Sequence, residues 1–219
     1  MKPITYITKR EFEEVLRKRF EERGRTRYDG FVGLVFAREG NEFVKKHLTP
    51  CRMDFHVRSG DHVDFFWVGW EHIRLDGPGI MDGNIWNFHS ERFESSRHHF
   101  EAETSWRFGG GTELVLIAVS YKLSERAPIL SLNQAIVCDL EKMVAVKTIL
   151  SVGHFFESIF RHCEDNTSAE SLKQFSDKLG AKIAGKSFLH YLISLLSKDL
   201  SYTAQQLMNL AIRDVSKNS

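Results

Sequence analysis

Residues 53–68 read MDFHVRSGDHVDFFWV, and this stretch decides the expected fold. Polar and apolar side chains alternate in 53–57 and again in 62–68, which is the pattern of half-buried strands. The short Ser59–Asp61 segment between them favours a tight reversal of the chain. A loop of these three residues aligns the two runs so that one face is apolar and the other polar. We therefore expect a β-hairpin in this part of the chain.

The polar face of the expected hairpin is the first candidate site. It would gather two histidines, three aspartates and one arginine within eleven residues. A carboxylate beside an imidazole can orient it for acid–base catalysis or complete a metal site, and an arginine can hold an anion in a bidentate manner. The alternative is a solvated sheet face, where cross-strand charge pairs add roughly 0.2–1 kcal/mol of stability. The candidate catalytic residues are His56, His62, Arg58 and Asp64, and the candidate metal ligands are Asp54 and Asp61.

Helix and strand patterns alternate on both sides of the hairpin. Thr8 and Glu11 form a capping-box pattern at the start of a helix that Gly24 can end. Further capped amphipathic segments predict a helical C-terminus, with Val215 in the last helix. The remaining expected elements are strands at 31–37, 112–121 and 129–137, and helices at 41–48, 86–106 and 140–163, the last interrupted near 151–153.

This order of elements predicts the α/β class, in the sense of a mixed α+β fold. We expect a central mixed sheet of about five strands flanked by helices, followed by a C-terminal helical segment. A thioredoxin-like or similar three-layer arrangement accommodates the order, as an analogy only. We divide the chain into an α/β domain at 1–165 and a helical extension at 166–219 that packs on the same domain.

Composition limits the function classes. The 219 residues carry a net charge of +1 and are 42% hydrophobic, which is typical of a globular protein without global attraction to nucleic acid or acidic membranes. The three cysteines lack Cys-x-x-Cys spacing, so we expect neither a disulfide framework nor a zinc knuckle. No apolar run is long enough to span a bilayer. We therefore expect a soluble, cytoplasmic protein with no membrane contact.

A phosphate-binding-loop motif, G-x-x-x-x-G-K-S, matches 180–187 at every specified position. Gly185, Lys186 and Ser187 would then cradle a nucleotide phosphate. The motif normally follows a buried strand, whereas an amphipathic helix is expected before Gly180. The alternative is that the two glycines connect helices.

Basic residues gather on the first helix and at its exit, where they could contact nucleic-acid phosphates. The alternative is a solvated helix face with intrahelical Glu–Arg pairs. The residues concerned are Arg17, Arg19, Arg23, Arg25 and Arg27.

A loop rich in glycine at 76–83 lies between Trp70 and Trp86. Aromatic side chains beside such a loop can form a surface for a ligand or a partner. The alternative is that they anchor the ends of the loop in the core.

Together these patterns favour a regulatory or complex-forming module that acts through protein–protein contacts, with a protein partner or with itself. The motivation is the lack of a complete catalytic signature, since no nucleophile elbow or dinucleotide fingerprint occurs. The competing hypothesis is a metal- or histidine-assisted hydrolase of phosphate esters or nucleic acid, which would use the hairpin residues and a divalent metal. Whether the protein is an enzyme, and which cofactor it takes, stay open at this point.

Overall fold

The computed structural model contains a main sheet and a small second sheet. It describes residues 2–4, 8–51, 54–55, 58, 63–74, 84–125, 127–165 and 212–215. The strands are β1 (Lys2–Ile4), β2 (Arg27–Phe36), β3 (Val63–Val68), β4 (Trp70–Arg74), β5 (Asn84–Phe88), β6 (Glu113–Lys122), β7 (Ile129–Asp139) and β8 (Ile212–Asp214).

The main sheet has six strands in the order β1-β3-β2-β6-β7-β8, and β4 pairs with β5 in the second sheet. Neighbours are parallel from β1 through β3 to β2, and antiparallel from β2 through β6 and β7 to β8. The short connection between β6 and β7 permits the antiparallel pair, whereas the parallel strands need crossovers. The mixed sheet and the α+β class are therefore confirmed.

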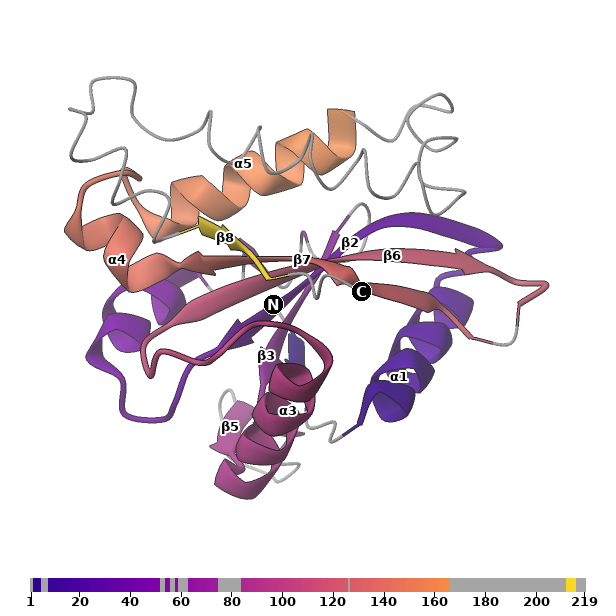
Figure 1. Cartoon of the computed structure of the whole chain (residues 1–219), viewed down its shortest axis with the longest axis horizontal. Coiled ribbons are helices and arrows are strands. Elements are labelled where there is room, and N and C mark those ends of the chain that lie inside the picture. Colours follow the sequence, from indigo (N-terminus) through magenta and orange to yellow (C-terminus); the bar gives the residue numbers. More distant parts are fainter. Residues whose placement is uncertain are drawn as a thin grey trace.

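Helices cover both faces of the main sheet (Figure 1). One face carries α1 (Lys9–Glu22) and α3 (Ser90–Glu103), and the other carries α4 (Leu140–Ala145) and α5 (Val152–Asp165). A short π-helical segment, η1 (Val44–Leu48), and a following 3-10 turn, η2 (Thr49–Cys51), join the side of α5. The result is the three-layer arrangement expected from the order of elements. No described helix has both the length and the apolar character needed to cross a membrane.

The first helix forms as its sequence predicts. The side chain of Thr8 accepts a hydrogen bond from the backbone of Glu11 at 3.2 Å, and Glu11 accepts one from the backbone of Thr8 at 3.0 Å. This reciprocal pair satisfies two N–H groups that have no partner within the helix. Phe12, Leu16 and Phe20 then recur on one face and are buried against the sheet.

The abundance of phenylalanine is explained by two aromatic cores, one on each side of the sheet. Beneath α5, Phe156 lies 4.7 Å from Phe65 of β3, measured between ring centroids. On the side of α1 and α3, Phe36 lies 4.6 Å from Trp106. Successive side chains of a strand point to opposite faces, so β2 and β3 each supply both cores.

The predicted hairpin is wrong. Asp54, Phe55 and Arg58 are helical, and β3 pairs in parallel with β1 and β2 instead of with 53–57. The ring of Phe55 stacks on Phe156 of α5 at 4.5 Å. A short segment that alternates polar and apolar residues can also form a single helical turn, and burial of Phe55 favours that turn here.

Two further elements differ from expectation. Trp86 lies in β5, and the helix after it begins only at Ser90. Residues 212–214, expected within the last helix, form the edge strand β8 antiparallel to β7. Tertiary pairing outweighs helix propensity in such a short segment. The rest of the predicted helical extension at 166–219 lies outside the described residues, apart from Val215, which follows β8.

Candidate functional site

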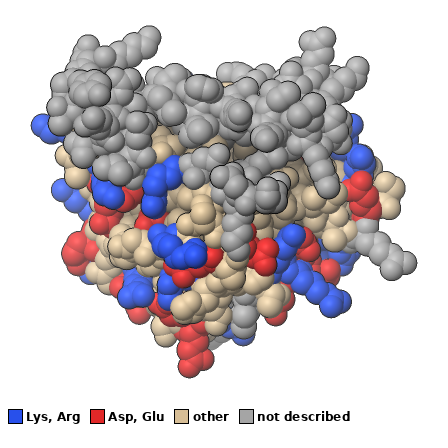
Figure 2. Space-filling model, in the orientation of Figure 1, with Lys and Arg blue, Asp and Glu red and all other residues tan. Residues whose placement is uncertain are grey.

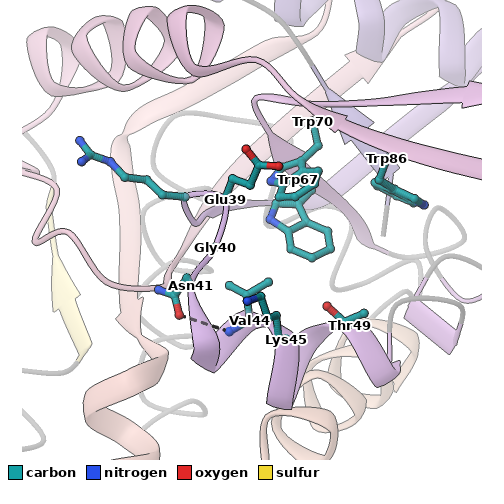
Figure 3. Close-up of a pocket in the computed structure, with 10 residues that line it drawn as sticks. Glu39, Gly40, Asn41, Val44, Lys45, Thr49, Trp67, Trp70 and Trp86 are labelled. Carbon is teal, nitrogen blue, oxygen red and sulfur yellow. Dashed lines mark hydrogen bonds between the residues drawn. The ribbon is translucent and has the colours of Figure 1, made fainter.

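A pocket of about 360 Å³ opens at the end of the sheet where β2 and β3 terminate (Figure 3). One wall consists of Trp67, Trp70 and Trp86. The other is formed by the turn at 38–41 and by Val44, Lys45 and Thr49 from η1 and η2. Its volume lies at the lower end of the range of about 300–1,000 Å³ that is typical of ligand pockets.

The topology of the sheet explains why a pocket forms here. β2 and β3 are adjacent and parallel, so their carboxyl ends meet at one edge. The chain leaves β2 toward η1, which packs on the same side as α5, whereas it leaves β3 into the β4–β5 ribbon and then reaches α3 on the opposite side. Where connections diverge to opposite faces, they leave a crevice, and this is the usual position of ligand sites in open α/β sheets.

The tryptophan wall is built from three strands. Trp67 is near the end of β3, and Trp70 and Trp86 lie on the same face of the β4–β5 ribbon, because Trp70 pairs with Phe88, two residues beyond Trp86. The ring centroid of Trp67 is 5.1 Å from that of Trp70 and 5.9 Å from that of Trp86. Trp67 is only 3% exposed, so this wall is held by the core.

Two hydrogen-bond donors of the wall are unused. The indole N–H groups of Trp67 and Trp70 are buried and have no partner among the described residues. In Figure 3 both indole nitrogens lie on the side of the rings that faces the turn carrying Glu39 and Gly40. A buried donor without a partner costs about 1–3 kcal/mol, so each one in a native structure calls for an explanation. A bound ligand that supplies acceptors is the explanation that fits their place in a pocket.

The charges around the pocket are largely compensated. Arg38 forms an ion pair with Glu94 at 2.7 Å, and Lys45 forms one with Glu42 at 2.6 Å. Glu39 is exposed and has no ion pair within the described part of the chain. The two cations of the lining are therefore paired, and Glu39 is the charged group of the lining without an ion pair among the described residues.

Asn41 fixes the turn that forms the second wall. Its side-chain oxygen accepts hydrogen bonds from the backbone N–H groups of Phe43 at 2.8 Å and Val44 at 3.3 Å. Its amide nitrogen donates to Glu141 at 2.8 Å, and Glu141 also accepts a hydrogen bond from Thr112 at 2.8 Å. The polar groups of Asn41 are thus occupied in holding the wall.

A buried carboxyl group lies next to Thr112. Glu113 accepts hydrogen bonds from the indole of Trp106 at 2.6 Å and from the backbone of Gly109 at 2.7 Å. Burial raises the pKa of Glu113 above its usual 4.5, although these hydrogen bonds act in the opposite direction.

This shift predicts a pH dependence of stability. Because the folded-state pKa of Glu113 is raised, its contribution to stability is fully present below about pH 4.5 and is lost as the pH rises through the folded-state value. We expect the thermal midpoint of the wild type, relative to that of Glu113→Gln, to fall as the pH increases from 4 to 7. Parallel profiles for the two proteins, measured by circular dichroism, would contradict the assignment.

The described members of the predicted hairpin site do not come together. Asp64 is fully buried on the α1 side of the sheet, where it forms an ion pair with Arg19. Arg58 lies on the other side, where it pairs with Glu157 of α5 and sits over the ring of Phe160 at 5.1 Å. The exposed Asp54 lies near Cys51 on η2. His56, Asp61 and His62 lie outside the described residues, so their proposed roles stay predictions.

The predicted basic surface is also divided. Arg19 is 6% exposed, and Arg17 pairs with Glu14 and Glu21, each at 2.6 Å. Arg27 pairs with Asp29, and the guanidinium of Arg25 lies 5.1 Å from the ring centroid of Tyr28. On the face shown in Figure 2, basic and acidic side chains alternate among the described residues instead of forming a single patch. Intrahelical pairing, the alternative interpretation, therefore accounts for Arg17.

The phosphate-loop match with Gly185, Lys186 and Ser187 lies outside the described residues. Within the part of the chain that is described, no three His, Cys, Asp or Glu side chains could hold a metal ion. Cys51, Cys138 and Cys163 are free, and burial raises the pKa of each, that of Cys163 to about 12. Such thiols are poor nucleophiles, because the thiolate is the reactive form.

Sequence reasoning identified part of this pocket and missed the rest. The two tryptophans that flank the loop at 76–83 gave a usable signal. The sequence around Trp67 predicts only a strand, and the turn at 38–41 carries no motif. Comparison with known protein families, with curated proteins and with solved structures finds no match for this chain, so its own geometry must carry the functional argument.

Proposed function

We propose that the protein is a non-catalytic binding module that acts through protein contacts, and that it makes the decisive contact with its tryptophan pocket. The observation that carries this proposal is the pair of buried indole donors, on Trp67 and Trp70, which have no partner among the described residues. Aromatic side chains in a desolvated pocket are the usual anchors of protein interfaces, and tryptophan is the most enriched of them.

Two features favour a protein partner over nucleic acid. Phosphate contacts dominate nucleic-acid affinity and need available cations, but both cations that line the pocket are paired with carboxylates. Glu39, which has no ion pair among the described residues, adds a negative charge beside the tryptophans. A peptide chain, in contrast, offers neutral carbonyl acceptors and apolar side chains. The hydrolase alternative gains no support from the described residues, since Arg58 and Asp64 lie on opposite sides of the sheet.

The proposal predicts that a partner peptide binds at Trp70. A library of random dodecapeptides displayed on phage would be selected on the wild-type protein and counter-selected on Trp70→Ala. Synthetic versions of the surviving peptides should lose about 30-fold or more in affinity on Trp70→Ala in calorimetric titrations, as expected for an interface hot spot. Leu123→Ala is the matched control, because Leu123 is 56% exposed and lies beyond β6 at the opposite end of the sheet.

Two outcomes would contradict the proposal. Selection that yields no peptide able to distinguish the wild type from Trp70→Ala would remove the pocket as a contact site. Peptides weakened equally by Leu123→Ala and Trp70→Ala would point to a general loss of structure. The thermal midpoints of both variants are measured alongside, so that unfolding is recognised directly.

A further inference from the structure

We propose that the tryptophan pocket recognises a proline-rich segment in the polyproline II conformation, with the indole N–H groups of Trp67 and Trp70 donating hydrogen bonds to its carbonyl oxygens. This inference rests on the proposed function and names the class of peptide. It follows from three properties of the pocket: its hydrogen-bonding capacity, its aromatic spacing and its charge.

The hydrogen-bonding capacity calls for a ligand that accepts and does not donate. Trp67 and Trp70 offer two unused donors. The side-chain oxygen of Asn41 already receives two backbone hydrogen bonds, so the carboxylate of Glu39 is the acceptor that remains beside the tryptophans. A proline has no N–H, and a polyproline II helix has no internal hydrogen bonds, so all its carbonyls are free to accept.

The spacing of the aromatic rings suits a polyproline II ligand. The ring centroid of Trp67 lies 5.1 Å from that of Trp70 and 5.9 Å from that of Trp86. A polyproline II helix rises about 3.1 Å per residue, so each of these distances matches about one and a half to two residues of the ligand. Proline-rich segments commonly dock in aromatic-lined grooves, and their stiffness reduces the entropy lost on binding. The rigid core position of Trp67 makes the wall equally preorganised.

The charge of the rim predicts the residues that flank the prolines. Arg38 and Lys45 form ion pairs with Glu94 and Glu42, whereas Glu39 is not paired in the described part of the chain. A basic residue next to the proline core would therefore be favoured over an acidic one. Nucleic-acid bases also stack on tryptophan, so single-stranded DNA is the rival ligand to test. Proteins that bind it normally do so in a positively charged groove.

The test uses decaproline as the probe, followed by tryptophan emission and by calorimetry on the full chain. We expect saturable binding, an affinity lowered about 5- to 30-fold by Trp70→Phe, and a smaller change with Trp86→Phe. Phenylalanine retains an aromatic ring but removes the N–H donor. The indole of Trp86 is not one of the unused donors, so Trp86→Phe is the matched control. Adding two arginines to one end of decaproline should raise the affinity for the wild type and not for Glu39→Gln.

Three outcomes would overturn the inference. The first is a glycine–serine decapeptide that binds as well as decaproline. The second is an oligothymidylate that binds with strong salt dependence and displaces decaproline, which would assign the pocket to nucleic acid. The third is a set of phage-selected peptides that require Trp70 but are not displaced by decaproline. In that case the proposed function stands and only the peptide class is wrong. If neither the selected peptides nor decaproline depend on Trp70, the proposed function and the peptide class are both wrong.

Discussion

Replacing Arg19 with methionine is expected to destabilise the protein by about 3–5 kcal/mol. Arg19 of α1 is 6% exposed, and its partner Asp64 of β3 is completely buried. Methionine fills much of the same space but leaves the carboxylate of Asp64 without its countercharge in the core. A buried charge without compensation is among the most costly changes in a folded protein. The free energy of unfolding from chemical denaturation measures the loss.

Arg17→Met is the matched control for this variant, because Arg17 lies on the exposed side of the same helix and forms ion pairs with Glu14 and Glu21. Surface pairs of this kind contribute little, so only a small change is expected. The double variant Arg19→Met with Asp64→Leu removes both charges and should recover most of the lost stability. Equal effects of Arg17→Met and Arg19→Met would show that the buried pair does not hold α1 on the sheet.

The same experiment separates the two interpretations of Asp64. The sequence suggested a catalytic carboxylate on a polar strand face, whereas the structure has it in a core ion pair beneath α1. A double variant that folds and still binds at the tryptophan pocket would assign Asp64 a structural role. The pocket lies on the other side of β3, since Trp67 packs with the core under α5.

Elements with strong local signals could be predicted from the sequence. The capping box of Thr8 and Glu11 satisfies backbone groups within one helical turn, so it acts the same way wherever the helix packs. The apolar runs of β2, β6 and β7 are buried on both faces, and such continuous runs need no partner to be recognised as strands or core helices. Their lengths and flanking glycine or proline then favour strands.

The segments that depend on distant partners could not be predicted. The turn around Phe55 is fixed by its stacking on Phe156, and β8 exists because β7 offers it an edge. The candidate site likewise depends on segments that are distant in the sequence. Trp67 and the turn at 38–41 meet only because β2 and β3 are parallel neighbours whose connections diverge. No local pattern encodes that arrangement, although Trp70 and Trp86 beside a glycine-rich loop indicated where aromatic residues would gather.

Gly69→Ala should produce the second large effect, a loss of about 2–5 kcal/mol in the free energy of unfolding. Gly69 has a φ of 80°, in the left-handed region that residues with a Cβ rarely adopt. An added Cβ would lie 2.7 Å from the Cβ of Phe93 and 3.2 Å from its Cα, so it would push against the backbone of α3. Denaturant unfolding followed by circular dichroism measures the change.

Gly24→Ala is the control that isolates the steric part of this effect. Gly24 also has a positive φ, of 64°, but an added Cβ there would meet nothing within 4 Å. It therefore reports the backbone strain alone, about 1–3 kcal/mol. Equal losses in the two variants would mean that α3 moves away from Gly69 without cost.

The position of Gly69 links this loss of stability to the pocket. Its N–H donates to the carbonyl of Ile4 and its carbonyl accepts from the N–H of His89, each at 2.8 Å, so the residue joins β1, β3 and the start of α3. Trp67 and Trp70 lie on either side of this junction. A shift of Gly69 that relieves the contact with Phe93 would therefore change the relative position of the two indole donors. We expect Gly69→Ala to weaken decaproline binding even at temperatures where the variant remains folded, and Gly24→Ala to leave it unchanged.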